Sequence, residues 1–262
     1  MENQAVITEV ENGVAVITLN EPKSLNSLSV EIVEGLTKSL QSIKHDPTVR
    51  AVILTGNGKA FCAGGNIKSF SSITSAASGR KYMHETGGFI KDLVQMEKPV
   101  IAAVNGYAVG AGFSIAIACD FVIASPHSKF ALGFHKVGLV PDLGGLYHLP
   151  RMVGMARAKE LAFSDRTLSA TEAKEYGICL EVVEEEQLLI RAMAMASSFA
   201  SSPTIAIGLA KGILNRSFES SLEDVLREEG MVQGISFTTE DHKEGVRAFI
   251  EKTKPTFTGS YS

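Results

Sequence analysis

One stretch of the chain, residues 98–119 (KPVIAAVNGYAVGAGFSIAIAC), restricts the fold more than any other. It is apolar almost throughout, with a β-rich run that ends at Gly106 and a second half typical of a buried helix. Elements that are apolar on every side are covered by other structure on both faces. The stretch therefore predicts a strand and a helix that are enclosed between layers of the protein.

Comparable units precede and follow this stretch. Short runs rich in β-branched and aromatic residues predict strands, and longer runs between them predict helices. Strands that alternate with helices favour an α/β architecture with parallel pairing. The predicted strands cover residues 14–20, 50–56, 98–106, 121–125 and 130–134, and the first predicted helix covers residues 29–46.

The strand signals stop near residue 201. We therefore divide the chain into a core of residues 1–200 and a helical region of residues 201–262. Pro203 suits the first turn of a helix. The helical region is too small to hold a core alone, so it should pack onto the main domain or onto another subunit. Its predicted helices cover residues 202–217, 221–237 and 243–252.

Residues 69–88 are rich in Ser, Ala and Gly and show little periodicity. We interpret them as a mobile loop near a binding site, with an ordinary surface connection as an equal alternative. His84 and Glu85 in this segment could reach a bound molecule, although a solvated loop is the simpler interpretation.

Composition and charge exclude several classes of function. The 262-residue chain has a formal net charge of −4 and no basic run, so no nucleic-acid partner is expected. No signal peptide is visible, and no apolar stretch reaches the ~18 residues of a membrane span. The chain has three widely spaced cysteines: Cys62, Cys119 and Cys179. No cluster of His, Cys or carboxylate residues has metal-ligand spacing. We expect a cytoplasmic protein with reduced thiols, no metal and no membrane partner.

Two glycine-rich loops follow predicted strands, at residues 61–66 (FCAGGN) and 105–114 (NGYAVGAGFS). A turn of small residues between a strand and a helix leaves backbone N–H groups pointing outward at the positive end of the helix. Two such groups can hold the negative oxygen of a reaction intermediate, as an oxyanion hole does. The dinucleotide and P-loop spacings are absent. Tight packing is the alternative for either loop taken alone.

Three segments in this order resemble the enoyl-CoA hydratase/isomerase, or crotonase, superfamily: AFCAGGNIKSF, KPVIAAVNGYAVGAGFSIAIACDFVIAS and VGLVPDLGGLYHLPRMVGMARAKEL. The resemblance extends from the first predicted strand to the AFIEK sequence near the C-terminus. It implies a spiral of ββα units, a C-terminal helical region that assembles a homotrimer or hexamer, and substrates that are thioesters of coenzyme A. Coenzyme A would be part of the substrate, so no separate cofactor is implied.

The resemblance also assigns roles to individual residues. The N–H groups of Ala63 and Ala111 would form the oxyanion hole, and Phe134 would lie in the pocket. Phe249 and Lys252 would contact the coenzyme A of a neighbouring subunit, with an exposed lysine on a terminal helix as an equal alternative. The other residues implied for the substrate channel are Gly64, Gly65, Asn66 and Ile67.

The two glutamates that hydratases of the family use are missing. The matching positions hold Ser114 and Phe134, and neither side chain can act as a general base for the addition of water. Hydration by paired glutamates is therefore disfavoured, although enoyl-CoA hydratase remains the family-level alternative.

One acid remains, Asp142, in the apolar and glycine-rich turn GLVPDLGG. It matches the single catalytic acid of double-bond isomerases in the family, and the surrounding sequence resembles the branch that isomerises ring epoxides in phenylacetate breakdown. Apolar neighbours that face the pocket would raise its affinity for protons by excluding water. The alternative is that Asp142 caps the following helix. The neighbours expected to exclude water are Phe134, Val140, Leu143 and Leu146.

Three functions remain open. The leading one is an acyl-CoA isomerase that uses Asp142 as acid and base. Displacement on a halobenzoyl-CoA is weaker, because that chemistry needs an N–H donor where Phe134 stands. The third is a non-catalytic acyl-CoA-binding homologue.

Two other candidate residues are given structural interpretations. His135 should point away from Phe134 on a predicted strand, and Cys62 is interpreted as a small buried thiol.

Overall fold

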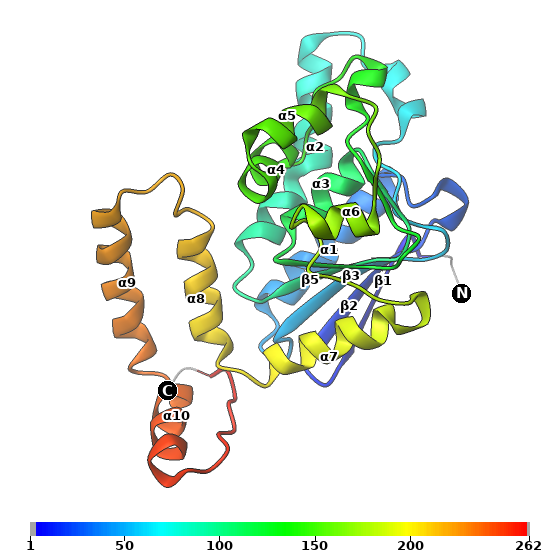
Figure 1. Cartoon of the computed structure of the whole chain (residues 1–262). Coiled ribbons are helices and arrows are strands. Elements are labelled where there is room, and N and C mark those ends of the chain that lie inside the picture. The colour runs from blue at the N-terminus through cyan, green and yellow to red at the C-terminus, as the bar shows by residue number, and fades with distance from the viewer. Residues whose placement is uncertain (1–3, 261–262) are drawn as a thin grey trace.

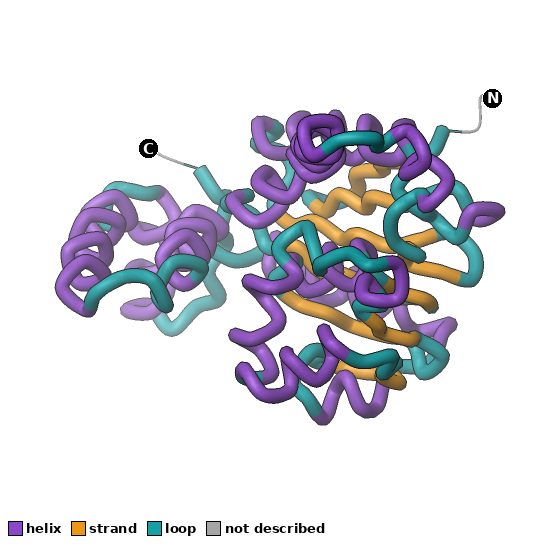
Figure 2. The backbone as a smooth tube through the Cα atoms, turned by 90° about the horizontal axis from the view of Figure 1, so that it is seen from above, coloured by secondary structure: helices purple, strands orange, loops and turns teal. Residues whose placement is uncertain are grey.

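The computed structural model describes residues 4–260, which form two β-sheets surrounded by helices (Figures 1 and 2). The larger sheet has the strand order β1-β2-β3-β5-β7-β10, and the smaller sheet has the order β4-β6-β8-β9. The pairs β1–β2 and β8–β9 are antiparallel, and the other pairs are parallel. The strands are β1 (Val6–Glu11), β2 (Val14–Leu19), β3 (Ala51–Gly56), β4 (Ala60–Cys62), β5 (Val100–Val104), β6 (Tyr107–Val109), β7 (Phe121–Ala124), β8 (Lys129–Ala131), β9 (Leu168–Ser169) and β10 (Glu181–Val182).

The middle of the chain repeats one unit, in which two consecutive strands enter different sheets and a helix follows. β3 and β4 precede α2 (Ala76–Gln95), and β5 and β6 precede α3 (Ala111–Ala118). β7 and β8 precede α4 (Gly145–Val153) and α5 (Met155–Phe163). Because each unit adds one strand to each sheet, the chain winds as a spiral. The predicted α/β architecture with ββα units is confirmed.

The predicted burial of the apolar stretch is also confirmed. Every residue of β5 and of α3 is buried. On the neighbouring strand β3, Val52 and Leu54 pack in the core that includes α1 (Val30–His45) and α2, while Ile53 packs on the opposite face with α7 (Leu188–Ala200). The large sheet is therefore covered by helices on both faces, as apolar strands require. The short helix α6 (Ala170–Glu175) links β9 to β10.

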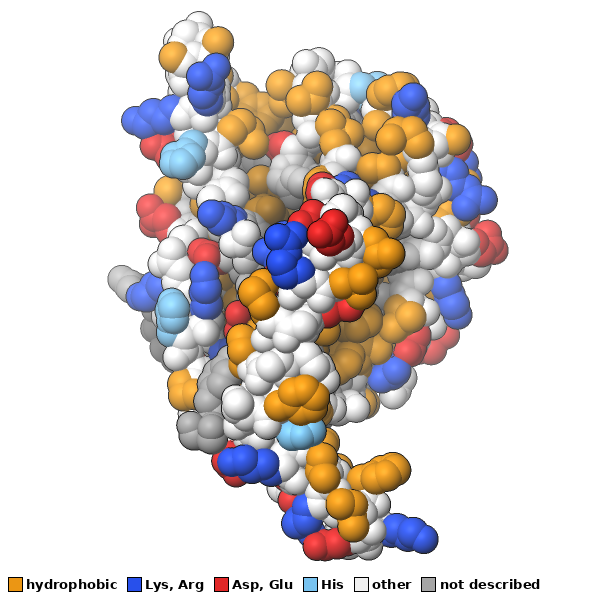
Figure 3. Space-filling model, turned by 90° about the vertical axis from the view of Figure 1, so that its left-hand side faces the viewer, with side chains coloured by type: hydrophobic (Ala, Val, Ile, Leu, Met, Phe, Trp, Pro, Cys, Tyr) orange, Lys and Arg blue, Asp and Glu red, His pale blue; other side chains and the backbone are white. Residues whose placement is uncertain are grey.

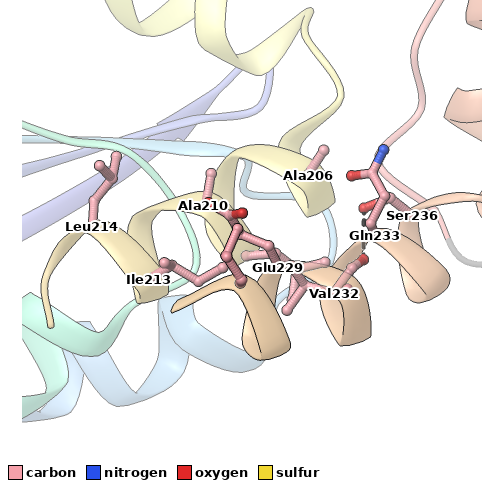
Figure 4. A pocket seen from close by; sticks show the side chains of 11 residues that line it. Ala206, Ala210, Ile213, Leu214, Glu229, Val232, Gln233 and Ser236 are labelled. Carbon is pink, nitrogen blue, oxygen red and sulfur yellow. Dashed lines mark hydrogen bonds between the residues drawn. The ribbon is translucent and has the colours of Figure 1, made fainter. Parts of the chain in front are cut away.

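The last three helices form an arm beside the rest of the chain (Figure 1): α8 (Thr204–Leu214), α9 (Leu222–Ser236) and α10 (Glu240–Glu251). A groove of about 660 Å³ runs between α8 and α9, where apolar side chains such as Ile213 and Val232 point into the space between the helices (Figure 4). α9 has no buried residue, and hydrophobic side chains are exposed along the arm (Figure 3). The exposed ones are Leu214, Phe218, Leu222, Leu226, Met231, Ile235, Phe237, Val246, Phe249 and Ile250.

Polar contacts fix the base of the arm to the core. Lys211 of α8 lies 2.7 Å from a carboxylate oxygen of Asp120, which follows α3. Arg50, at the start of β3, donates hydrogen bonds to the carbonyl oxygens of Ser202 and Phe257 at 2.6 and 2.8 Å. The arm is thus attached at defined points while most of its apolar surface stays uncovered.

The structure differs from the sequence prediction at residues 69–88, which are not a mobile loop. α2 begins at Ala76, because the side chain of Ser75 accepts a hydrogen bond from the N–H of Ser78 and the Ser78 hydroxyl bonds back to Ser75. Buried Phe89 and Leu93 hold the second half of the helix against the core. Serine in place of Glu or Gln makes this capping box a weak sequence signal, and the small residues hide the helix.

The strand predicted over residues 130–134 is also wrong in its extent. β8 ends at Ala131, and Gly133, with φ of 64°, turns the chain into a 3₁₀ helix over Phe134–Val137. Phe134 and His135 therefore do not alternate across a strand. Their different surroundings come from this turn instead.

No single helix in the described part of the chain combines the length and apolar composition of a membrane span. The segments Glu185–Ala200 and Thr204–Leu214 meet those limits only as a pair, across a bend of 104°. The first of them includes α7, which packs on the large sheet.

Candidate active site

A cavity of about 520 Å³ brings together most of the residues that the sequence assigned to the site. It lies between α2, the start of α3 and the segment from Leu132 to Leu143. The assigned residues that line it are Ala63, Gly64, Gly65, Ile67, Ala111, Phe134 and Asp142. Sequence reasoning missed the contribution of α2, which supplies Tyr82, Met83 and Thr86, because that segment was predicted to be a loop.

The second glycine-rich loop places the N–H group of Ala111 at the cavity. Ala111 is the first residue of α3, where an N–H group has no partner inside the helix. The next residue, Gly112, approaches β4 so closely that a Cβ atom would collide with the carbonyl group of Cys62. This contact fixes the start of α3, whose N-terminal end carries a partial positive charge, against the first glycine-rich loop.

In the structure, the N–H group of Ala63 is not free to serve as the second donor. Its N–H group already donates to the carbonyl oxygen of Leu25 at 3.0 Å, and the N–H group of Gly64 interacts with the thiol of Cys62. The N–H group of Gly65 makes no hydrogen bond within residues 4–260. Since Gly65 lines the cavity, it is the donor that remains available beside Ala111.

The two loops approach each other at this point. A Cβ atom on Gly64 would lie 2.9 Å from the carbonyl oxygen of Val109 and 3.5 Å from the nitrogen of Ala111. Gly64 also has φ of 100°, which favours glycine. The close approach sets the N–H groups of Gly65 and Ala111 on adjacent loops at one side of the cavity.

The remaining assigned residues lie elsewhere. Asn66 is outside the cavity lining, while Ile67 is 64% exposed and lies at its rim. Phe249, on α10, is 86% exposed, and Lys252 caps the end of the same helix. Neither lines the Asp142 cavity of its own chain.

Asp142 lies half-buried in the cavity wall. Its Oδ1 atom is buried and has no hydrogen-bond partner within the described residues. Burial raises the pKa of this carboxyl to about 6, against a smaller opposing effect of its own backbone N–H. The capping alternative fails, because the N-cap of α4 is Gly144 and no side chain caps that helix.

The apolar surroundings of Asp142 differ in part from the expectation. Phe134 and Leu143 are each 8% exposed and line the cavity as predicted. Val140 and Leu146 do not, since they point to the surface with exposures of 74% and 53%. Val137 and Leu139 take their places in the lining. Consecutive left-handed residues, Leu143 and Gly144, turn the chain after Asp142, between Asp142 and Leu146.

Aromatic rings flank the two N–H groups. The ring of Phe70 comes within 3.0 Å of the position that a Cβ atom on Gly65 would take, and the ring of Phe134 within 3.8 Å of that on Gly110. Tyr82 packs edge-on against Phe70 with ring centroids 5.8 Å apart. Each of the two glycine-rich loops therefore has an aromatic ring beside it in the cavity lining.

Neither position that holds a glutamate in hydratases offers a base here. Ser114 is fully buried and does not line the cavity. Gly145, the first residue of α4, packs so closely that a Cβ atom there would lie 2.5 Å from the hydroxyl oxygen of Ser114. Phe134 lines the cavity with an apolar ring. Asp142 is the one carboxylate in the lining formed by the described residues.

The two other candidate residues, Cys62 and His135, lie in surroundings that favour a structural role over a catalytic one. Cys62 is buried, and desolvation raises the pKa of its thiol to about 12, so it is not a nucleophile at neutral pH. His135 lies on the outer side of the 3₁₀ turn, where its Nε2 atom is 2.5 Å from the carboxylate of Asp165 on the surface. Neither residue lines the cavity.

Comparison with known proteins gives consistent matches over nearly the whole chain. Residues 9–260 match the family model described as enoyl-CoA hydratase/isomerase. The 1,2-epoxyphenylacetyl-CoA isomerase of Escherichia coli is 38% identical over 257 residues, which cover 97% of this chain and 98% of the relative. The short-chain-enoyl-CoA hydratase of Clostridium acetobutylicum is 39% identical over 255 residues, 97% of each chain.

Solved structures agree with the sequence relatives. The crystal structure of an enoyl-CoA hydratase from Bacillus anthracis superposes with a TM-score of 0.93 at 36% identity, covering 98% of this chain and 100% of that one. An isomerase and a hydratase match this chain at almost the same identity, so identity alone does not separate the two activities. The fold, the family model and these relatives agree that the chain belongs to the enoyl-CoA hydratase/isomerase family, the crotonase superfamily.

Proposed function

We propose that this chain is an acyl-CoA isomerase in which Asp142 transfers the proton and the N–H groups of Gly65 and Ala111 hold the thioester oxygen. The observation that carries the proposal is the single carboxylate of the cavity, whose Oδ1 atom is buried without a partner and whose pKa is raised to about 6. A base with this pKa is ionised at neutral pH and is stronger than an ordinary aspartate.

The proposed reaction needs one base and one oxyanion hole. Asp142 takes a proton from the carbon next to the thioester, and the negative charge moves to the thioester oxygen as an enolate forms. The N–H groups of Gly65 and Ala111 stabilise that charge without moving. Asp142 then returns the proton two carbons further along, so the double bond has shifted and the carboxylate is regenerated.

Hydration is the second candidate, because several relatives are named hydratases. Addition of water needs a group that activates the water as well as one that protonates carbon. Buried Ser114 and apolar Phe134 supply neither. We therefore place isomerisation before hydration, and a non-catalytic acyl-CoA-binding role last, since such a protein has no need of a carboxylate with a raised pKa.

The substrate class can be tested directly with three thioesters: a trans-2-enoyl-CoA, a cis-3-enoyl-CoA and 1,2-epoxyphenylacetyl-CoA. The last is included because the E. coli relative is named for it and because aromatic rings flank the site. We expect turnover of at least one of the last two without uptake of water, measured by chromatography and mass spectrometry of the products. Faster formation of a hydroxyacyl-CoA from the trans-2-enoyl-CoA would favour the hydratase, and binding without turnover would favour the non-catalytic role.

The proposal includes a homotrimer or a dimer of trimers built through the arm. α9 buries no residue in a single chain, and the exposed apolar side chains of the arm need a partner to cover them. Phe249 and Lys252 would then reach the coenzyme A of a neighbouring subunit, which their position outside their own cavity allows. The buried free cysteines are compatible with the reducing cytoplasm, where we place the reaction.

We predict that sedimentation at low micromolar concentration gives the mass of a trimer or hexamer. Replacing Phe249 and Ile250 by serine should shift the distribution toward smaller species, because these side chains are 86% and 73% exposed in the single chain. Phe163, which is 74% exposed on α5, gives a control replacement outside the arm. A parent protein that sediments as a stable monomer would contradict the assembly.

A further inference from the structure

The turn between α8 and α9, residues 215–221, contacts α2, which lines the active-site cavity, and α4, which follows the Asp142 turn. Asn215 makes one bond to each side. Its side-chain amide donates to the carbonyl oxygen of Val94 in α2 at 3.1 Å, and its main-chain carbonyl accepts a hydrogen bond from the hydroxyl of Tyr147 in α4 at 2.8 Å. A single residue of the arm therefore links α2 to α4.

A second set of contacts ties the same turn to α4. Glu219 pairs with the guanidinium of Arg151, and its carboxylate lies 3.1 Å from the Tyr147 hydroxyl, whose single proton it shares with the carbonyl oxygen of Asn215. The guanidinium also covers the ring of Tyr147 at 3.5 Å, donates to the Tyr147 carbonyl oxygen at 2.6 Å and approaches the ring of Phe218 at 5.5 Å. The turn is thus joined to one face of α4 by several mutually supporting contacts.

Of the two helices, α2 lines the cavity, and α4 is joined to it through the Asp142 turn. α2 supplies Tyr82, Met83 and Thr86 to the lining. α4 begins directly after the Asp142 turn, where the N–H group of Gly145 donates to the main-chain carbonyl of Asp142 at 2.8 Å. The position of α4 relative to α2 therefore bears on how the Asp142 turn lies against the cavity.

The Asp142 turn needs external support. Leu143 has φ of 47°, a left-handed conformation that is unfavourable for a branched residue and persists only where the surrounding structure holds it. Its side chain lies against α2, within 3.3 Å of the position that a Cβ atom on Gly87 would take. If α4 and the Asp142 turn moved away from α2, Leu143 would lose this contact and water would reach Asp142.

We propose that Asn215 and Tyr147 are positioning residues for Asp142. The α8–α9 turn holds α2 and α4 together, and so it excludes water from the catalytic carboxylate and fixes the orientation of that group. The role of Asp142 as the base is taken from the proposed function. The consequence is that the arm, whose outer surface is available for assembly, also acts on the active site of its own chain.

Few charged groups face Asp142 from the surrounding elements. Among the described residues that line the cavity, the ionisable ones are Asp142 and Tyr82. α3 has no ionisable residue, and His135 and Lys136 of the 3₁₀ turn both pair with Asp165. On α4, burial and then Arg151 lower the pKa of His148. His148 is therefore neutral at neutral pH, and the positive charge of α4 is that of Arg151. A change in the pKa of Asp142 will therefore report mainly on the access of water to its carboxylate.

The test combines Asn215→Leu, which keeps the size but removes the amide donor, with Tyr147→Phe, which removes only the hydroxyl. The parent and the double variant are labelled with ¹³C at the aspartate carboxyl groups, and the Asp142 signal is assigned by its absence in Asp142→Asn. We expect the pKa of Asp142 to fall by about one unit in the double variant as water enters. With the best substrate, we expect kcat to fall about 10-fold and KM to change less than about 2-fold, because positioning rather than binding is lost.

The matched control is Glu181→Gln, which breaks the ion pair with Arg191 outside the cavity lining and should leave the titration and kcat unchanged. An unchanged Asp142 titration in a double variant that melts at lower temperature would overturn the proposal, since the turn would then only stabilise the fold. An unchanged titration with unchanged melting would overturn it as well. The titration needs no turnover, so a shifted pKa in a protein without isomerase activity would support positioning while rejecting the proposed function.

Discussion

Asp142→Asn is expected to lower the rate of isomerisation by at least ~100-fold, the lower range for a positioned general base. Asparagine has the same size but cannot accept the proton, so the oxyanion hole and the apolar lining stay in place. The affinity for the coenzyme A thioester should therefore persist. The comparison requires kcat and KM with the best substrate of the screen, together with a binding measurement on the variant.

The same substitution should stabilise the fold at neutral pH. The folded pKa of Asp142 is raised to about 6, above the ~3.9 of an exposed aspartate. Ionisation of this carboxylate therefore opposes folding, with no effect below about pH 4 and the full effect above about pH 6. Removing the charge should raise the free energy of unfolding at pH 7.5 by roughly 2 kcal/mol and leave it nearly unchanged near pH 3.5. Urea unfolding at both pH values measures the difference.

Asp92→Asn provides the matched control, because Asp92 is an aspartate of α2 with a 24% exposed side chain that pairs with Lys44 outside the cavity. It should leave the isomerisation rate unchanged and give no stabilisation at pH 7.5. Isomerisation by Asp142→Asn at the parent rate would show that another group moves the proton, and a loss of stability at neutral pH would contradict the desolvated carboxylate.

The layered fold could be predicted because its central strand and helix are apolar on every side. β5 and α3 have no polar face, and only enclosure between layers explains such a pattern. β1 was missed for the converse reason. Most of its residues are exposed, and it joins the sheet through backbone pairing with β2 rather than through an apolar face.

The position of Asp142 in an apolar cavity was predictable, but its immediate neighbours were not. The sequence shows a carboxylate among apolar residues, and this suffices to predict a raised pKa. Which apolar residues face it depends on the backbone path around it, which includes the left-handed turn at Leu143 and Gly144 and leaves Val140 and Leu146 at the surface. A glycine pair in the sequence permits such a turn without fixing its direction.

The proposed oxyanion hole illustrates the same limit. The small residues of the first loop pointed to the region, but which of its N–H groups is free to donate depends on which is already occupied. Ala63 is occupied because Leu25, in a left-handed turn at φ of 55°, presents its carbonyl oxygen to it. Since Leu25 lies far from Ala63 in the sequence, no local pattern distinguishes Ala63 from Gly65.

Ala111→Pro is expected to lower turnover by about 100-fold to 1,000-fold, because losing one oxyanion-hole donor costs ~3 kcal/mol of transition-state stabilisation. Proline has no N–H group, and the first position of a helix tolerates it because that N–H group has no partner inside the helix. Gly110, the preceding residue, has no Cβ atom to clash with the proline ring. The substitution therefore removes the proposed donor with limited damage to α3.

The control for this substitution is Ala76→Pro, which makes the same change at the first position of α2, where the preceding Ser75 is extended and Ala76 lies outside the cavity. Both variants are compared with the parent in thermal unfolding and in steady-state kinetics. If Ala111→Pro stays folded and binds the thioester, we expect kcat to carry most of the loss, since the N–H group bonds more strongly to the enolate than to the substrate. A folded Ala111→Pro variant with parent kcat would place the thioester oxygen elsewhere and would remove the oxyanion hole from the proposed mechanism.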